Sequence, residues 1–267
     1  MLPLVPDVVP NIIQALILVV IFCLVGGKAL HKHPWPFYIV AIVSGVLTFV
    51  TPVTDIYAAQ VVLDILASCY TGVAMYLLVM FAGALPRRWK FTKLLLTMRS
   101  ELSILAGIII MAHVFKVAFF VPMSLTPFWI LVWKRAFIWM FVASTLVGVP
   151  LLICFMIPWI TSFPVVRKRL EFWDWKKKQR LAYPFMALLI AQGILLSCGH
   201  ACYVGSDDAG YVGYVVNGIT YAVIGMAYLV LKLVQKKQRA QRKAELQEKA
   251  GEQAECVEGV QASAADE

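Results

Sequence analysis

The sequence predicts an all-α membrane protein, a bundle of about seven transmembrane helices, and three observations lead to this fold class. Of the 267 residues, 61% are hydrophobic and only 15% are charged, and the mean hydropathy is +0.80. Nearly uncharged apolar runs recur along the chain, each close to the roughly 20 residues with which a helix crosses a bilayer. Lysine and arginine are concentrated in every second connection between these runs. We therefore expect a multi-pass protein of a cell membrane, plasma or inner.

Seven apolar runs have the length of a membrane span, with ends defined to within several residues. The first run lacks the basic start and the small-residue cleavage site of a secretory signal, so we expect it to be a retained helix. After Val234 the composition changes to Lys, Arg, Gln, Glu and Ala and then to an acidic end, which predicts a short amphipathic helix followed by a disordered tail. The seven runs are 8–29, 37–57, 61–84, 100–122, 135–161, 181–203 and 209–234.

The distribution of charge predicts the orientation of the spans. The second, fourth and sixth connections carry Asp55, the uncharged stretch 123–128, and Asp207 with Asp208, whereas the other connections and the tail are basic. Because basic connections stay in the cytoplasm, the N-terminus is expected outside and the C-terminus inside. The cations of the basic connections and the tail are Lys28, Lys32, Arg87, Arg88, Lys90, Lys93, Arg99, Arg167, Lys168, Arg169, Lys176, Lys177, Lys178, Arg180, Lys236, Lys237, Arg239, Arg242 and Lys243.

The net charge of +9 does not indicate a nucleic-acid partner, because nearly all cations lie where they would orient a membrane protein. Lys134 and Arg135, at the outer start of the fifth run, are an exception; they either snorkel to headgroups or meet an anionic partner. The sequence contains no GxGxxG, GxxxxGK[ST] or HExxH motif. Any flavin or nicotinamide chemistry coupled to this chain is therefore expected in another protein.

His113 is the first candidate site residue. It lies fourteen residues after Arg99, about 21 Å along a helix, and Gln192 reaches a similar depth at about 18 Å beyond Arg180. Side chains at one height on different helices are able to flank a cofactor, although Gln ligates haem iron poorly. Spacing alone leaves three interpretations of His113 open: an imidazole hydrogen-bonded to a neighbouring helix, a haem ligand, and a proton or substrate site.

A second group of candidates lies toward the outer end of the sixth run. Cys198, His200 and Cys202 lie close together in sequence, and Cys69 is expected on the same side of the membrane. The Cys-x3-Cys spacing separates the two thiols by one helical turn, which permits a disulfide, a metal site or thiol exchange. Small apolar cysteines packed between helices are the simpler interpretation, and we favour it.

Two further groups have simple structural interpretations. His31 and His33, beside the interfacial Trp35, are expected in an anchoring loop, because two histidines without a carboxylate or thiol make an incomplete metal site. Six tryptophans near predicted span boundaries are expected to form an aromatic belt. They are Trp129, Trp133, Trp139, Trp159, Trp173 and Trp175.

Several short motifs lie between about Asp64 and Leu196. They are Leu85-Pro86-Arg87-Arg88 at the end of a span, Arg99 followed by His113, Thr161-Ser162 before Val166-Arg167-Lys168-Arg169-Leu170, and Trp175 leading to Arg180-Leu181-Ala182-Tyr183. This pattern, over about half of the chain, resembles the ferric-reductase-like transmembrane domain family. Within that family it is most similar to the haem-binding membrane subunit that supplies electrons to the periplasmic methionine sulfoxide reductase.

The resemblance implies a haem b site and also a departure from the family pattern. It makes His113 an axial haem ligand, and it places two further family histidines, thirteen residues apart, at Gln179 and Gln192. The chain would then lack the ligand of an inner haem and the second ligand of an outer one. Either one haem remains, five-coordinate or ligated by another side chain such as His200, or haem has been lost. His200 lies about 12 Å beyond Gln192 along the helix.

The resemblance divides the chain into an N-terminal pair of spans (1–60), a ferric-reductase-like core (61–203), a last span (204–234) and a cytoplasmic, largely disordered tail (235–267). It implies a haem-b electron-transfer component, at most a subunit of an oxidoreductase. A quinol or a cytoplasmic reductase would be the donor and an extracytoplasmic reductase the acceptor, with Lys116 beside a haem propionate. The alternatives are a haem-free scaffold, sensor or small-molecule carrier, and a thiol-disulfide exchange protein.

Overall fold

A computed structural model describes residues 10–50, 63, 65, 69–133, 138–206 and 210–265. Every regular element in this part of the chain is a helix, which confirms the all-α fold class. The helices are α1 (Asn11–Lys32), α2 (Pro34–Val50), α4 (Cys69–Ala82), α5 (Lys90–Thr97), α6 (Arg99–Trp133), α7 (Ile138–Ile160), α8 (Pro164–Arg167), α9 (Phe172–Gln179), α10 (Ala182–Val204) and α11 (Gly210–Ala265).

Each of the seven apolar runs contains a helix: α1, α2, α4, α6, α7, α10 or α11. Among the described residues, 4 helices are long and apolar enough to cross a membrane. The number rises to 5 if the bent pair α5 and α6 is one span. The apolar parts of α2 and α4 are shorter. The chain is thus an all-helical protein with several helices able to span a membrane, whereas the seven spans and the orientation of the termini stay predictions.

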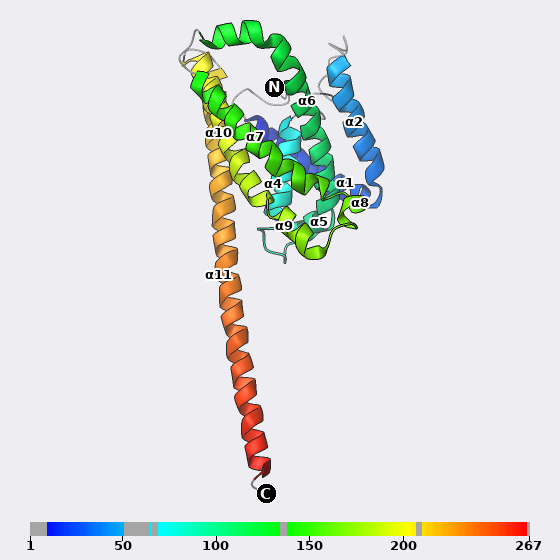
Figure 1. Ribbon diagram of the computed structural model, residues 1–267, viewed down its shortest axis with the longest axis vertical. Helices are drawn as coiled ribbons and strands as arrows, with labels where there is room; N and C mark the ends of the chain where they lie inside the picture. The colour runs from blue at the N-terminus through cyan, green and yellow to red at the C-terminus, as the bar shows by residue number, and fades with distance from the viewer. Residues whose placement is uncertain are drawn as a thin grey trace. The chain divides into compact units, whose positions relative to one another are not determined.

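The chain divides into two compact units, residues 1–225 and 226–267. In the first unit α4 is the central helix, since nearly all of its residues from Thr71 to Ala82 are buried. The helices α1, α5 and α6 pack against α4, α2 packs on α6, and α7 packs on α10 (Figure 1). A helix that is apolar on every side is stable only when neighbours surround it, which explains this position of α4.

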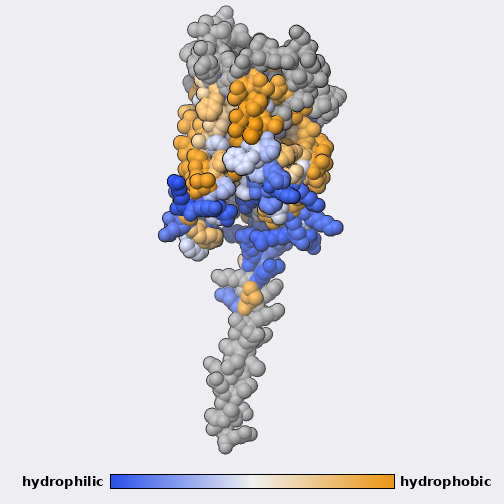
Figure 2. All heavy atoms as spheres, turned by 90° about the vertical axis from the view of Figure 1, so that its right-hand side faces the viewer, coloured by the Kyte–Doolittle hydropathy of each residue, from blue (hydrophilic) through white to orange (hydrophobic). Residues whose placement is uncertain are grey.

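The outer helices of the first unit expose apolar side chains. Ile39 and Val46 of α2, Leu146 of α7 and Ile219 of α11 are each more than half exposed. In Figure 2 hydrophobic side chains cover the described helices on one face, and hydrophilic side chains gather at one end of them. Exposed apolar surface of this extent is typical of helices that contact lipid.

The basic connection between α4 and α6 contains a helix that the sequence did not predict. In α5, Thr92 and Leu95 are buried while Lys90 and Lys93 are exposed, so this short segment is amphipathic. A bend of 66° separates α5 from α6 at Met98, whose side chain is buried and contacts Gly27 of α1. The bend exists because α5 buries its apolar face against α1 and α4 instead of continuing α6.

The tail also differs from the prediction, because α11 continues to Ala265 instead of ending in a disordered segment. The segment 235–265 is rich in Ala, Gln, Glu and Lys and contains no proline. These residues have high helix propensity, so a helix that begins in the apolar run is able to continue through them. In the second unit, the Lys232 ammonium lies 5.5 Å from the centre of the Tyr228 ring.

Some predictions concern residues outside the described part of the chain. These are the outer charges Asp55, Lys134, Arg135, Asp207 and Asp208, and the start of the family resemblance at Asp64. The side chains of Trp129, Trp133 and Trp139 also lie outside it.

Candidate functional site

His113 lies on α6, and its side chain is half-buried. Among the described residues it makes no hydrogen bond, although the positive charge of Lys116 acts on its imidazole. Lys116 and Phe115, one turn or less further along α6, are exposed. The interpretation of His113 as an imidazole hydrogen-bonded to a neighbouring helix therefore has no partner to support it in this part of the chain.

Gln192 lies on α10, on the side that faces α7. A methyl group at Gly148 of α7 would lie 3.7 Å from Nε2 of Gln192, an ordinary van der Waals contact. The Oε1 atom of Gln192 is buried and has no hydrogen-bond donor among the described residues. A buried amide oxygen without a donor is uncommon in folded proteins, so this atom calls for a partner that the described residues do not supply.

The two candidates are on different helices. His113 belongs to α6, which packs mainly on α4 and α2, while Gln192 belongs to α10, which packs mainly on α7; both helices also contact α4 and α7. No hydrogen bond joins the two side chains in the described structure. Each of them is a polar side chain within an apolar helix, and of the two only Gln192 has a buried polar atom without a hydrogen-bond partner among the described residues.

Gln179, the position that the resemblance assigns to the ligand of an inner haem, has a structural role. Its Nε2 donates hydrogen bonds to the carbonyl oxygen of Pro158 at 3.1 Å and to Oγ1 of Thr161 at 3.0 Å. The Ser162 hydroxyl donates to the same carbonyl at 2.7 Å. The last carbonyl groups of a helix lack hydrogen-bond donors within the helix. Here Gln179 of α9 supplies a donor to such a carbonyl group at the end of α7.

The space between α4, α7 and α10 is filled by packed aromatic side chains. The rings of Tyr76, Phe155 and Phe185 have centroids 5.3 to 5.9 Å apart, and Trp159 stacks on Phe155 at 5.7 Å. The Ser103 hydroxyl donates to the Tyr76 oxygen at 3.4 Å. With Gln179 engaged in hydrogen bonds and no imidazole at its position, these residues do not fit an inner haem.

The cysteines and the histidine at the end of α10 form no cluster suited to a metal within the described structure. Cys69, Cys198 and Cys202 are free thiols, and no group of three His, Cys, Asp or Glu side chains suited to a metal occurs among the described residues. His200 lies with Nδ1 2.7 Å from the carbonyl oxygen of Leu196, and its ring stacks on Tyr214 at 5.1 Å. His200 is thus held by α10 and α11.

Sequence reasoning missed a polar chain between α10 and α11. Asn217 donates from Nδ2 to the Ser197 hydroxyl at 2.8 Å, and Ser197 donates to the carbonyl oxygen of Gly193 at 2.7 Å. The single hydroxyl proton of Ser197 is used, so Asn217 must present its NH₂ group to Ser197. The Oδ1 atom of Asn217 is then buried with no donor among the described residues. An asparagine within an apolar run was the signal that pointed to this contact.

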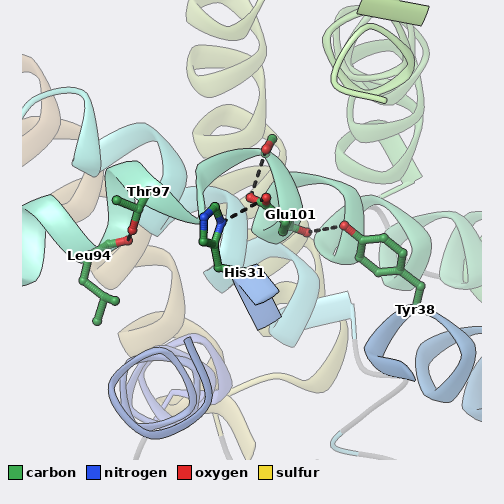
Figure 3. A network of polar contacts seen from close by, with 6 residues as sticks. His31, Tyr38, Leu94, Thr97 and Glu101 are labelled. Carbon is green, nitrogen blue, oxygen red and sulfur yellow. Dashed lines mark hydrogen bonds and ion pairs between the residues drawn. The ribbon is translucent and has the colours of Figure 1, made fainter. Parts of the chain in front are cut away.

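The basic end of the bundle contains a second contact that the sequence did not reveal (Figure 3). His31 of α1 lies with Nδ1 3.2 Å from Oε1 of Glu101, in the first turn of α6. The Ser100 hydroxyl donates to Oε2 of Glu101 at 2.9 Å, and the Tyr38 hydroxyl of α2 donates to its backbone oxygen at 3.5 Å. His31 therefore connects helices, while His33 and Trp35 remain exposed.

Two of the predicted belt tryptophans are tied to the backbone. Trp159 donates from Nε1 to the carbonyl oxygen of Ile104, and Trp175 donates to that of Thr161. Trp173, by contrast, is 65% exposed. The aromatic belt stays a prediction, and the structural roles of Trp159 and Trp175 add to it.

Comparisons with protein-family models, curated proteins and solved structures find no match for the chain. The resemblance to the ferric-reductase-like family therefore rests on the short motifs in the sequence and stays an expectation.

Proposed function

We propose that this chain is an integral-membrane electron-transfer component that holds one haem b through His113. The observation that carries the proposal is that His113, half-buried on an apolar helix, makes no hydrogen bond in the described structure. An ionisable group placed inside a membrane helix is costly and is typical of a functional site. An imidazole without a hydrogen-bond partner is suited to bind a metal.

A bound haem would supply one-electron transfer, and the chain's own residues would hold and surround it. His113 would be the axial ligand. Lys116, exposed one turn away, would pair with a propionate. Gln192 would donate a hydrogen bond from Nε2 to the cofactor or contact its edge.

A single haem is preferred to two. Gln179 is occupied at the end of α7, and aromatic side chains pack between α4, α7 and α10. Electrons would enter from a membrane quinol or a cytoplasmic reductase and leave to an extracytoplasmic reductase. The chain would reside in the cell membrane, plasma or inner, as one subunit of an oxidoreductase system.

A second candidate, a haem-free scaffold, sensor or small-molecule carrier of the same architecture, is favoured by one observation. At a position where the family pattern has a haem ligand, the Gln179 amide makes two hydrogen bonds that stabilise helix ends. A chain in which one former ligand position has a structural role could also function without the remaining haem.

The absorption spectrum of the detergent-purified full chain, expressed with ample haem, tests the proposal. We expect a Soret band in oxidised and dithionite-reduced wild type and its loss in His113→Ala. His200→Ala is the matched control, because that imidazole already contacts Leu196 and Tyr214; it should retain the band. Absence of the band from wild type, or its persistence in folded His113→Ala, would contradict the assignment and favour the haem-free alternative.

A further inference from the structure

The short helix α9 has two different faces. Trp175 and Gln179 are partly buried and donate hydrogen bonds to Thr161 and Pro158 at the end of α7. All other residues of α9 are exposed. One face of the helix is therefore tied to the bundle, which holds the exposed side chains of α9 in a defined position.

The exposed part of α9 combines aromatic rings with a cation. Phe172 is 61% and Trp173 65% exposed, although both are large apolar side chains. The Lys176 Nζ lies 5.5 Å from the centroid of the Phe172 ring and 5.0 Å from that of Trp173. These three residues form one continuous surface, which we name the α9 surface. Val165 of α8, 67% exposed, adds a further apolar side chain to this segment.

The segment has a large excess of positive charge. Between residues 167 and 180 the chain carries seven Lys and Arg but only Glu171 and Asp174. Asp174 pairs with Lys177 at 3.6 Å, an exposed contact of small energy. The guanidinium of Arg167 lies 4.7 Å from the centroid of Trp175. Most of the positive charge near the α9 surface is therefore not neutralised by a carboxylate in the described structure.

We propose that the α9 surface binds the headgroup of an anionic phospholipid. Trp and Phe side chains are stable at the depth of lipid headgroups, and a lysine beside them places its ammonium next to the lipid phosphate. An acidic protein partner would match the charge but would not account for exposed aromatic side chains on a chain with several membrane-spanning helices. The inference does not depend on the proposed electron-transfer function.

Lipid binding to the full chain in detergent tests this proposal by native mass spectrometry and by thermal unfolding. Wild type should bind phosphatidylglycerol saturably and gain more thermal stability from it than from phosphatidylcholine of the same chain length. The variant Trp173→Ala/Lys176→Gln should bind phosphatidylglycerol at least about fivefold more weakly, the factor expected for one cation at an anionic surface. Its melting temperature in phosphatidylcholine should equal that of wild type, since both side chains are exposed.

The matched control is Lys90→Gln/Lys93→Gln on α5, which removes exposed basic charge that has no aromatic partner in the described structure. This variant should keep phosphatidylglycerol affinity within twofold of wild type. An equal loss in both variants would show diffuse attraction and overturn the site. Equal binding of both lipids by wild type would overturn it too, even if the α9 variant failed to fold. The proposal would also be overturned if a soluble acidic peptide, but not phosphatidylglycerol, bound at the α9 surface and raised the melting temperature.

Discussion

At the residue scale, two glutamines that the resemblance treats alike have opposite environments. Gln179 uses its amide nitrogen in two hydrogen bonds, whereas Gln192 has a buried oxygen with no donor among the described residues. An unmade hydrogen bond costs about 1–3 kcal/mol when its group is buried. A substitution at position 192 is therefore able to change the side chain without breaking a hydrogen bond of that amide oxygen to another described residue.

The variant Gln192→His should change the iron coordination of a haem held by His113. A second imidazole at this depth would make the iron six-coordinate, so the reduced spectrum should sharpen into the pattern of two axial histidines. The matched variant Gln179→His should not add a second haem and should lower stability, because it removes two hydrogen bonds at the end of α7. Absorption spectra and haem-to-protein ratios measure both. An unchanged spectrum in Gln192→His would show that this position does not face the cofactor.

At the element scale, small residues determine how closely the helices approach. Gly107 of α6 faces the indole of Trp159 on α7, and Gly193 of α10 faces the Tyr221 ring on α11. Gly72 of α4 lies against α6 in the same way. Close backbone approach through small residues stabilises helix pairs in membranes, where lipid is as apolar as the side chains. The aromatic rings occupy the space that a Cβ would take.

The variant Gly107→Ala should destabilise the bundle, because the added methyl would collide with the Trp159 indole. Overpacking of this kind costs about 1–3 kcal/mol, more than the gain of up to about 1 kcal/mol in helix propensity. Gly148→Ala is the matched control, since its methyl would meet Gln192 at an ordinary 3.7 Å. Thermal unfolding in detergent should show a lower melting temperature for Gly107→Ala and no decrease for Gly148→Ala. Equal melting temperatures in both would mean that Trp159 does not limit the approach of the helices.

At the scale of the whole molecule, the alternation of basic connections predicts one topology. The basic residues of α5, α8 and α9 lie in the third and fifth connections, and none of those described there is buried. Transferring them across a membrane would be costly, so they should all remain on the cytoplasmic side. The same rule places the connection before α11 outside and the end of α11 inside.

Reporter fusions test this topology. A green fluorescent protein fused after residue 267 should fluoresce, and alkaline phosphatase at the same place should be inactive, because the C-terminus is predicted to be cytoplasmic. Alkaline phosphatase inserted into the connection 204–209 should be active. The opposite pattern would reverse the orientation and move His113 to the cytoplasmic half of the membrane.

Hydropathy and helix propensity predict the all-helical class from the sequence alone, because both are properties of one segment. The tertiary structure decided which side chains meet. Gln179 contacts Pro158 across 21 residues, Trp159 contacts Ile104 across 55, and His31 contacts Glu101 across 70. No local pattern encodes such pairs, since they exist only once helices distant in sequence have packed, and the bend before α6 likewise depends on the buried face that α1 and α4 offer to α5.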